Sequence, residues 1–124
     1  MSNKHIMSAL GYGLLGLILG IYMASSKNHS QLVTHAHTML LGFVVSFIYG
    51  VLIKVWSIEH KLVFIQFLCH QVGTVVLLIS LFCMYGGLVE KSTLGPFLGI
   101  SSIIVFVGMV LMKIMFIQQS KSNN

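Results

Sequence analysis

Four apolar runs, each about as long as a bilayer is thick, constrain this chain more than any other feature. They cover residues 6–24, about 32–56, 62–85 and 97–117. A membrane-spanning helix needs about 20 mostly apolar residues, and a helix satisfies its backbone polar groups internally, as lipid requires. We therefore predict an all-α integral membrane four-helix bundle, with residues 1–124 forming a single transmembrane domain.

Short polar breaks separate the runs, at residues 25–28, 57–61 and 86–96, and their Ser, Asn, Gly and Pro content is typical of turns. Consecutive helices should therefore be antiparallel. The first run is longer than the apolar core of a signal peptide, about 7–15 residues, so we expect it to be retained as a helix. Only 7% of the residues are charged, against roughly 25% in soluble domains, which argues against a water-soluble fold.

The lysines are distributed unequally between the two ends of the predicted bundle. One end carries Lys4, Lys54, Lys61, Lys113 and Lys121, and the other carries Lys27 and Lys91. Because positive residues favour the cytoplasmic side, we expect both termini in the cytoplasm. The lack of a long targeting segment suits a multi-pass protein of a bacterial inner (cytoplasmic) membrane. The lysines are isolated rather than clustered, so we expect no nucleic-acid partner.

Small residues recur at helical spacing in two of the runs. The first run carries Ala9, Gly13, Gly16, Gly20 and Ala24, and the fourth begins with Gly95, Gly99 and Ser102. Such stripes let membrane helices approach closely. We interpret both as ordinary helix packing rather than as a special dimerisation motif.

The six histidines fall into two groups. The first group belongs to the terminus or to loops, and we expect it to be solvated: His5, His29 and His60. The second group lies within the apolar runs: His35, His37 and His70. Ionisable residues inside a membrane are costly and are candidates for function.

His35 and His37 form a His-Ala-His sequence, and positions two apart on a helix point about 200° away from each other. The His35 side is small and polar and suits the bundle interior, with Met39, Gly42, Ser46 and Tyr49. The His37 side suits lipid or a cofactor, with Leu41, Val44, Ile48 and Val55.

His70 lies deeper, on a face shared with Gln66, Gly73 and Thr74. Glycine one turn away leaves room either for a flat macrocycle or for a close neighbouring backbone. His70 could therefore form a hydrogen bond between helices, or its neutral imidazole could bind haem iron or copper. The residues alone leave both interpretations open.

Two motifs carry a family resemblance. The second run reads Thr34-His-Ala-His-Thr-Met-Leu-Leu-Gly-Phe and continues to Phe47-Ile-Tyr-Gly50, and the third reads Phe64-Ile-Gln-Phe-Leu-Cys-His-Gln-Val-Gly73. Together they resemble small four-helix membrane proteins related to subunit I of haem-copper oxidases, the cytochrome c oxidases and nitric oxide reductases. The chain departs from that pattern at Met39, where the family has Asn, and at Ile65 or Gln66, where it has a further His.

The resemblance implies binding of haem b, with His37 matching the second-helix ligand and His70 the third-helix histidine. His35 is a third candidate for cofactor or metal binding. The implied roles are electron transfer, gas sensing or support of a respiratory complex, and oxygen reduction is not among them. The only acids, Glu59 and Glu90, are expected in loops, which gives little support to independent catalysis.

Helix geometry complicates a site with both ligands in one chain. At 1.5 Å per residue, His37 and His70 should differ in depth by about 16 Å in a simple hairpin. Three arrangements remain open: thioether partners from Met23, Met84, Met109 or Met112; a homodimer that pairs two His37 residues; and a copper site at His35 and His37.

Copper handling and a cofactor-free accessory subunit are the alternative functions. The expected partners are the lipid bilayer, further copies of the chain or subunits of a respiratory complex.

Overall fold

A computed structural model describes residues 1–122 and is helical in all its regular segments. The helices are α1 (Ser2–Ser26), α2 (Leu32–His37), the π-helix η1 (Thr38–Val45), α3 (Ser46–Val55), α4 (Val63–Tyr85) and α5 (Lys91–Ser122). Since α2, η1 and α3 follow one another without a break, they make one span, Leu32–Val55. Four helices within the described residues are thus long and apolar enough to cross a membrane. The prediction of an all-α, multi-pass membrane bundle is confirmed.

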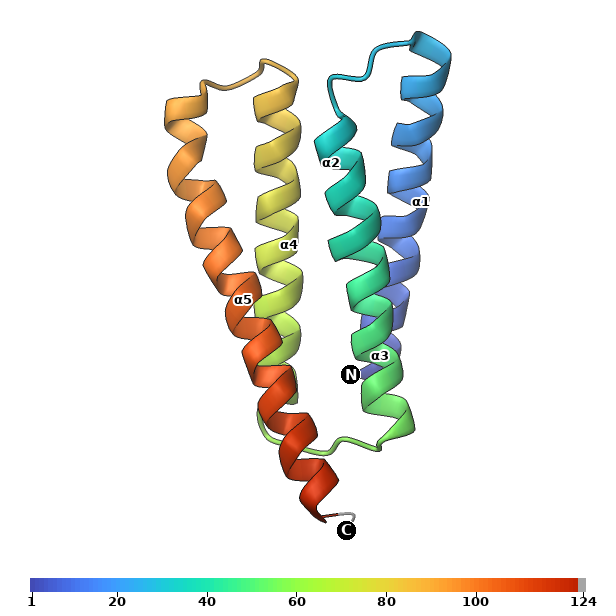
Figure 1. Ribbon diagram of the computed structural model, residues 1–124, viewed down its shortest axis with the longest axis vertical. Coiled ribbons are helices and arrows are strands. Elements are labelled where there is room, and N and C mark those ends of the chain that lie inside the picture. The colour runs from blue at the N-terminus through green and yellow to red at the C-terminus, as the bar shows by residue number, and fades with distance from the viewer. Residues whose placement is uncertain (123–124) are drawn as a thin grey trace.

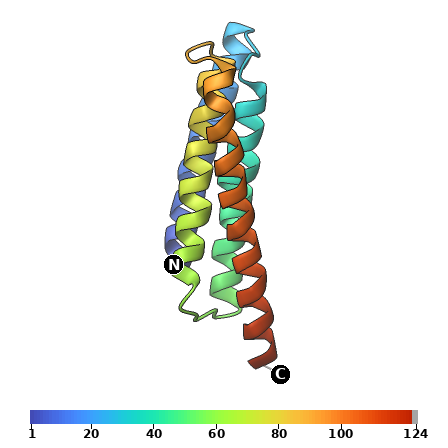
Figure 2. The same ribbon diagram turned by 90° about the vertical axis from the view of Figure 1, so that its left-hand side faces the viewer.

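The spans run up and down in an antiparallel bundle (Figure 1). Both termini lie near the connection between α3 and α4, at what we call the terminal end (Figures 1 and 2). The connections from α1 to α2 and from α4 to α5 lie at the opposite, far end. The two termini therefore share one side, as an even number of spans requires.

The last helix is longer than its apolar run. It begins at Lys91 rather than at residue 97, so Gly95 and Pro96 lie inside α5 and not in a loop. Proline lacks the N–H that would bond to the carbonyl four residues earlier, so near the start of a helix it removes a single backbone bond. The turn before α5 is made instead by Gly87, whose φ of 69° is readily adopted only by residues without a Cβ atom.

The bundle consists of two helical hairpins. One pairs α1 with η1 and α3, and the other pairs α4 with α5, while the contacts between the hairpins are fewer and run mainly from α2 and η1 to α4. At the terminal end an apolar cluster joins the hairpins, made of Tyr49, Ile53, Ile58, Val63, Met112 and Met115. The hydrophobic core is therefore concentrated in the half of the bundle nearer the termini.

The two stripes of small residues have different surroundings. A Cβ atom on Gly13 would lie 3.2 Å from the Phe43 ring, and one on Gly20 would lie 3.1 Å from the His35 ring. The stripe on α1 thus allows close packing on the second span, as predicted. On α5, by contrast, a Cβ atom on Gly95 or Gly99 would meet nothing within 4 Å. The second stripe is not used for packing within the described chain.

The middle of the second span is a π-helix, Thr38–Val45. A π-helix bonds residue i to residue i+5, is rare, and occurs mostly as single turns near functional sites. Here it separates the two histidines of α2 from Ser46, the first residue of α3. No residue pattern in the second apolar run predicts this π-helix.

Candidate functional site

Five polar side chains meet in the interior where the two hairpins face each other: His5, Ser46, Gln66, His70 and Gln71. We call this group the central polar cluster. Four of its members are 0% exposed and Gln71 is 9% exposed. They come from α1, α3 and α4, so the cluster connects both hairpins.

His5 lies at the centre of the hydrogen bonds in this cluster. Its Nε2 lies 3.0 Å from the Gln66 Oε1, which can only accept, so the proton is on Nε2. The Gln71 amide then donates to His5 Nδ1 over 3.3 Å, and also to the Ser46 hydroxyl over 3.3 Å. Gln66 in turn donates to the Gly108 carbonyl of α5 over 3.3 Å. Every hydrogen bond of the His5 ring is therefore made within the protein.

The full burial of His5 corrects the expectation that this residue is solvated at the N-terminus. The helix begins at Ser2, so His5 already lies within α1. It precedes Ala9 by four residues and therefore belongs to the same buried face as Ala9, Gly13 and Gly16. Extending the stripe of small residues back by one turn would have identified it.

His70 is enclosed on α4. Its Nε2 lies 2.9 Å from the Ser46 hydroxyl, and its ring packs edge-on against Tyr49 with the ring centroids 4.9 Å apart. The space beside Gly73 is filled by α5, since a Cβ atom there would lie 2.8 Å from Val105 and 3.2 Å from the Ser101 carbonyl. Of the two uses of that glycine, close approach of a neighbouring helix is the one observed. The surroundings of His70 therefore do not fit a macrocycle.

His35 points toward α1, as predicted for the interior side of the second span. Its Nδ1 lies 2.8 Å from the Gly16 carbonyl, and because a carbonyl only accepts, Nδ1 donates. The ring rests over Gly20. His35 thus joins α2 to α1 and is half-buried between them.

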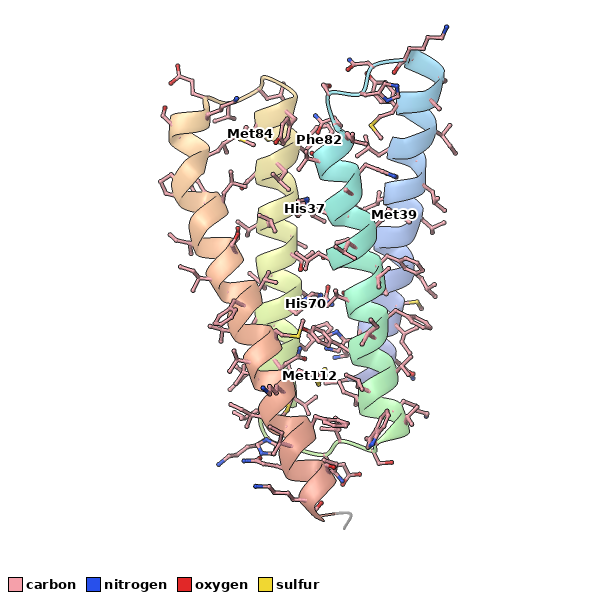
Figure 3. The ribbon with its side chains drawn as sticks, in the orientation of Figure 1. His37, Met39, His70, Phe82, Met84 and Met112 are labelled. Atoms are coloured by element: carbon pink, nitrogen blue, oxygen red, sulfur yellow. The ribbon has the colours of Figure 1, made fainter. Side chains whose placement is uncertain are left out.

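His37 points the other way and is exposed. Its Nδ1 lies 2.9 Å from the Val33 carbonyl one turn earlier, so Nδ1 donates there and the lone pair of the neutral ring is on Nε2. Figure 3 shows the side chain between α2 and α4, nearer the far end than His70. The structure therefore does not bring His37 and His70 to one site.

A groove of about 360 Å³ lies beside His37, between α2, α4 and α5. Its other lining residues are Ala36, Leu40, Leu41, Leu77, Ser102 and Val105. Within the described part of the chain, the groove contains no second imidazole and no thioether. Met39, for example, packs against Gly16 on the opposite side of the span, and Met109 accepts the Tyr49 hydroxyl at 3.2 Å.

A larger cavity of about 930 Å³ lies on the other side of α2, between α1, α2 and α4 near the far end. Its polar wall is formed by Gln31, Thr34 and Thr38, and no histidine, cysteine or methionine lines it. Nor do residues 1–122 contain a group of three or more His, Cys, Asp or Glu side chains placed to hold a metal. Among the three predicted site residues, His37 lines one of these two cavities, and His35 and His70 line neither. No protein-family model, no curated protein and no solved structure matches this chain.

Proposed function

We propose that this chain is a membrane haem b-binding protein in which His37 provides an axial ligand to the iron. The observation that supports this is the state of the His37 ring: Nδ1 donates to the Val33 carbonyl at 2.9 Å, which leaves the Nε2 lone pair without a hydrogen-bond partner. Histidines that bind metals almost always donate their other N–H to a carbonyl or a carboxylate, which fixes the tautomer and the ring orientation. Haem bound there would supply one-electron transfer or binding of a diatomic gas.

The groove supports the same proposal. Sites for cofactors are concave and mostly apolar, with a few polar groups that fix orientation. The wall beside His37 has this character, with aliphatic side chains around one imidazole and the Ser102 hydroxyl, which is bonded to the Leu98 carbonyl at 2.7 Å. His37 lines this groove, and ligation would give its Nε2 a partner. His37 is therefore the residue through which this chain would hold haem.

His35 and His70 have positioning roles in this proposal. His35 fixes α2 against the Gly16 carbonyl, and His70 fixes α4 against Ser46. The His70 bond joins the second span to α4 on either side of the groove, whereas the His35 bond holds the second span against α1. The roles of the bound haem that we propose are electron transfer, gas sensing or support of a respiratory complex.

The test is the colour of the purified full-length protein from haem-supplemented cells. We expect a Soret band, with sharp bands on reduction, for the wild type and for His29→Ala, which removes an exposed loop histidine. His37→Ala should lose these bands while keeping its helical circular dichroism. Retention of the full spectrum by His37→Ala would contradict the assignment of this ligand.

A second candidate, a cofactor-free accessory subunit, is favoured by the hydrogen bonds of His35 and His70. Both rings join helices in the way that polar side chains stabilise membrane bundles without any cofactor. Protein purified from haem-fed, copper-replete cells that contains neither haem nor copper would support this second candidate. Elemental analysis of the same samples distinguishes copper handling, our other alternative, from haem binding.

We also propose that the terminal end lies in the cytoplasm of a bacterial inner membrane. The support is the excess of lysine at that end, five residues against two. His37, nearer the far end, would then lie in the outer half of the bilayer.

A further inference from the structure

We propose that the cavity of about 930 Å³ between α1, α2 and α4 binds an isoprenoid quinone, with the quinone ring at the far end and the tail directed toward the centre of the bundle. This cavity lies on the side of α2 opposite His37, so the inference does not depend on haem. It rests on the chemistry of the lining, on a hydrogen-bond donor held at the far end and on a route from the bilayer.

The lining of the cavity changes in character along the length of the helices. At the far end it is aromatic, with Tyr22 on α1 and with Phe82 and Tyr85 on α4 (Figure 3 shows Phe82 near the far end of α4). Toward the centre of the bundle it is aliphatic, with Leu15, Ile18, Val75 and Ile79. Aromatic side chains stack on flat rings, and aliphatic side chains pack against a branched hydrocarbon chain. The two ends of the cavity therefore match the two parts of an isoprenoid quinone.

Gln31 supplies a hydrogen-bond donor at the aromatic end. Its Nε2 donates to the Phe82 carbonyl at 3.0 Å, and its Oε1 accepts from the Thr34 hydroxyl at 2.7 Å. These bonds fix the amide, which is only 6% exposed, and within the described residues they leave the second N–H of Nε2 without an acceptor. A Cβ atom on Gly86 would lie 3.2 Å from this nitrogen, so glycine keeps the space beside it free. A buried N–H without an acceptor is costly, and a ring carbonyl would satisfy it.

The lining is also uncharged, which favours a neutral head over a phosphate. Within the described part of the chain, the residues around the cavity include no Lys, Arg, Asp, Glu or His. Phosphates in proteins are commonly held by charge-assisted hydrogen bonds from Arg or Lys. A phospholipid head is therefore less well matched than a ring with two carbonyls, which needs hydrogen-bond donors but no cation.

The arrangement of the helices gives a membrane-soluble ligand a route into the cavity. The second span packs against both α1 and α4, whereas α1 and α4 make few contacts with each other. The walls come only from α1, the second span, α4 and the adjoining connections, so no helix of the described chain covers the cavity opposite the second span. In a bilayer this side faces lipid, and a quinone can enter from there without crossing water.

The experiment is native mass spectrometry of the full-length protein released from phosphatidylcholine nanodiscs that contain a decyl benzoquinone. We expect one quinone per chain at saturation for the wild type. Ile79→Trp should fill the cavity and weaken quinone binding by about tenfold or more. The matched control is Ile65→Trp, because Ile65 is also an exposed residue of α4 but lines neither cavity, and it should bind as the wild type does.

A second readout tests recognition of the ring and does not depend on the folding of Ile79→Trp. Decylbenzene carries the same tail without the carbonyls, and the wild type should bind it more weakly than the quinone. Gln31→Met, which removes the donor and keeps the side-chain length, should weaken quinone binding by about 2–10-fold. It should leave the binding of decylbenzene unchanged, whereas a general loss of packing would weaken both ligands.

Three results would overturn the inference: quinone binding unaffected by Ile79→Trp, equal binding of quinone and decylbenzene by the wild type, or a phospholipid held at one per chain that the quinone does not displace. His37→Ala should bind the quinone as the wild type does. Absence of haem from every sample would therefore leave this inference standing, and absence of bound quinone would leave the proposed haem function standing.

Discussion

The hydrogen bond between His5 and Gln66 gives the sharpest test of how the hairpins are held together. We consider His5→Leu and Gln66→Leu, singly and together. Each single change leaves a buried polar atom without a partner, because the two side chains bond over 3.0 Å and both are 0% exposed. In the double variant neither member of this pair remains to be satisfied, so part of the cost is recovered.

The magnitude follows from the partners. His5 bonds to two groups, Gln66 and Gln71, and hydrogen bonds between membrane helices contribute on average about 0.6 kcal/mol each, with a maximum of about 1.7 kcal/mol. We therefore expect His5→Leu to lower the free energy of unfolding by about 1–3 kcal/mol. The coupling energy of the His5–Gln66 pair alone should be about 0.6–1.7 kcal/mol, so the double variant is more stable than the sum of the single effects predicts.

The assay is reversible unfolding in mixed micelles with increasing SDS, followed by helical circular dichroism. The control cycle combines His5→Leu with Ser101→Ala, because Ser101 is equally buried but bonds only within its own helix, to the Leu98 carbonyl at 3.1 Å. That pair should show no coupling. If the His5–Gln66 cycle gives the same value as the control cycle, the central polar cluster does not join the hairpins as we describe.

Two further predictions concern packing and topology. Gly73→Ala places a Cβ atom 2.8 Å from Val105 and should lower the free energy of unfolding by about 1–3 kcal/mol in the same SDS titration. The control Gly11→Ala meets nothing within 4 Å and should change that free energy by less than about 1 kcal/mol. Equal effects of the two substitutions would refute the close approach of α4 and α5. In cells, with Cys69 and Cys83 replaced by Ala, Asn28→Cys should react with a membrane-impermeant maleimide added from outside and Glu59→Cys should not; the reverse pattern would invert our proposed orientation.

The spans were predictable because lipid imposes a simple requirement on length and polarity. The opposite directions of His35 and His37 also followed from helix geometry alone: one bonds to α1 and the other faces outward. The start of α5 was less predictable, since Gly95-Pro96 is a turn signal that a helix can include near its N-terminus at the cost of one bond.

The central polar cluster was only partly predictable. The sequence placed Gln66 and His70 on one face of the third span, but His5 was missed because a residue so near the N-terminus was assumed to lie outside the helix. The use of Gly73 could not be decided in advance, since open space and a close neighbour both require glycine. Side chains of α5 lie against Gly73 and fill the space beside it, and no local pattern around residue 73 predicts their presence.

The π-helix Thr38–Val45 determines which changes in length the second span tolerates. A turn bonded from i to i+5 holds one residue more than an α-helical turn, and one residue corresponds to about 100° of helix rotation. If the same eight residues adopted α-helical geometry, Ser46, Tyr49 and Ile53 would rotate away from α4 and α5, and His70 would lose its hydroxyl partner. A one-residue deletion within Thr38–Val45 should therefore give an α-helix that keeps these side chains in place, whereas a one-residue deletion at the start of α3 should rotate the side chains that follow it by about 100°.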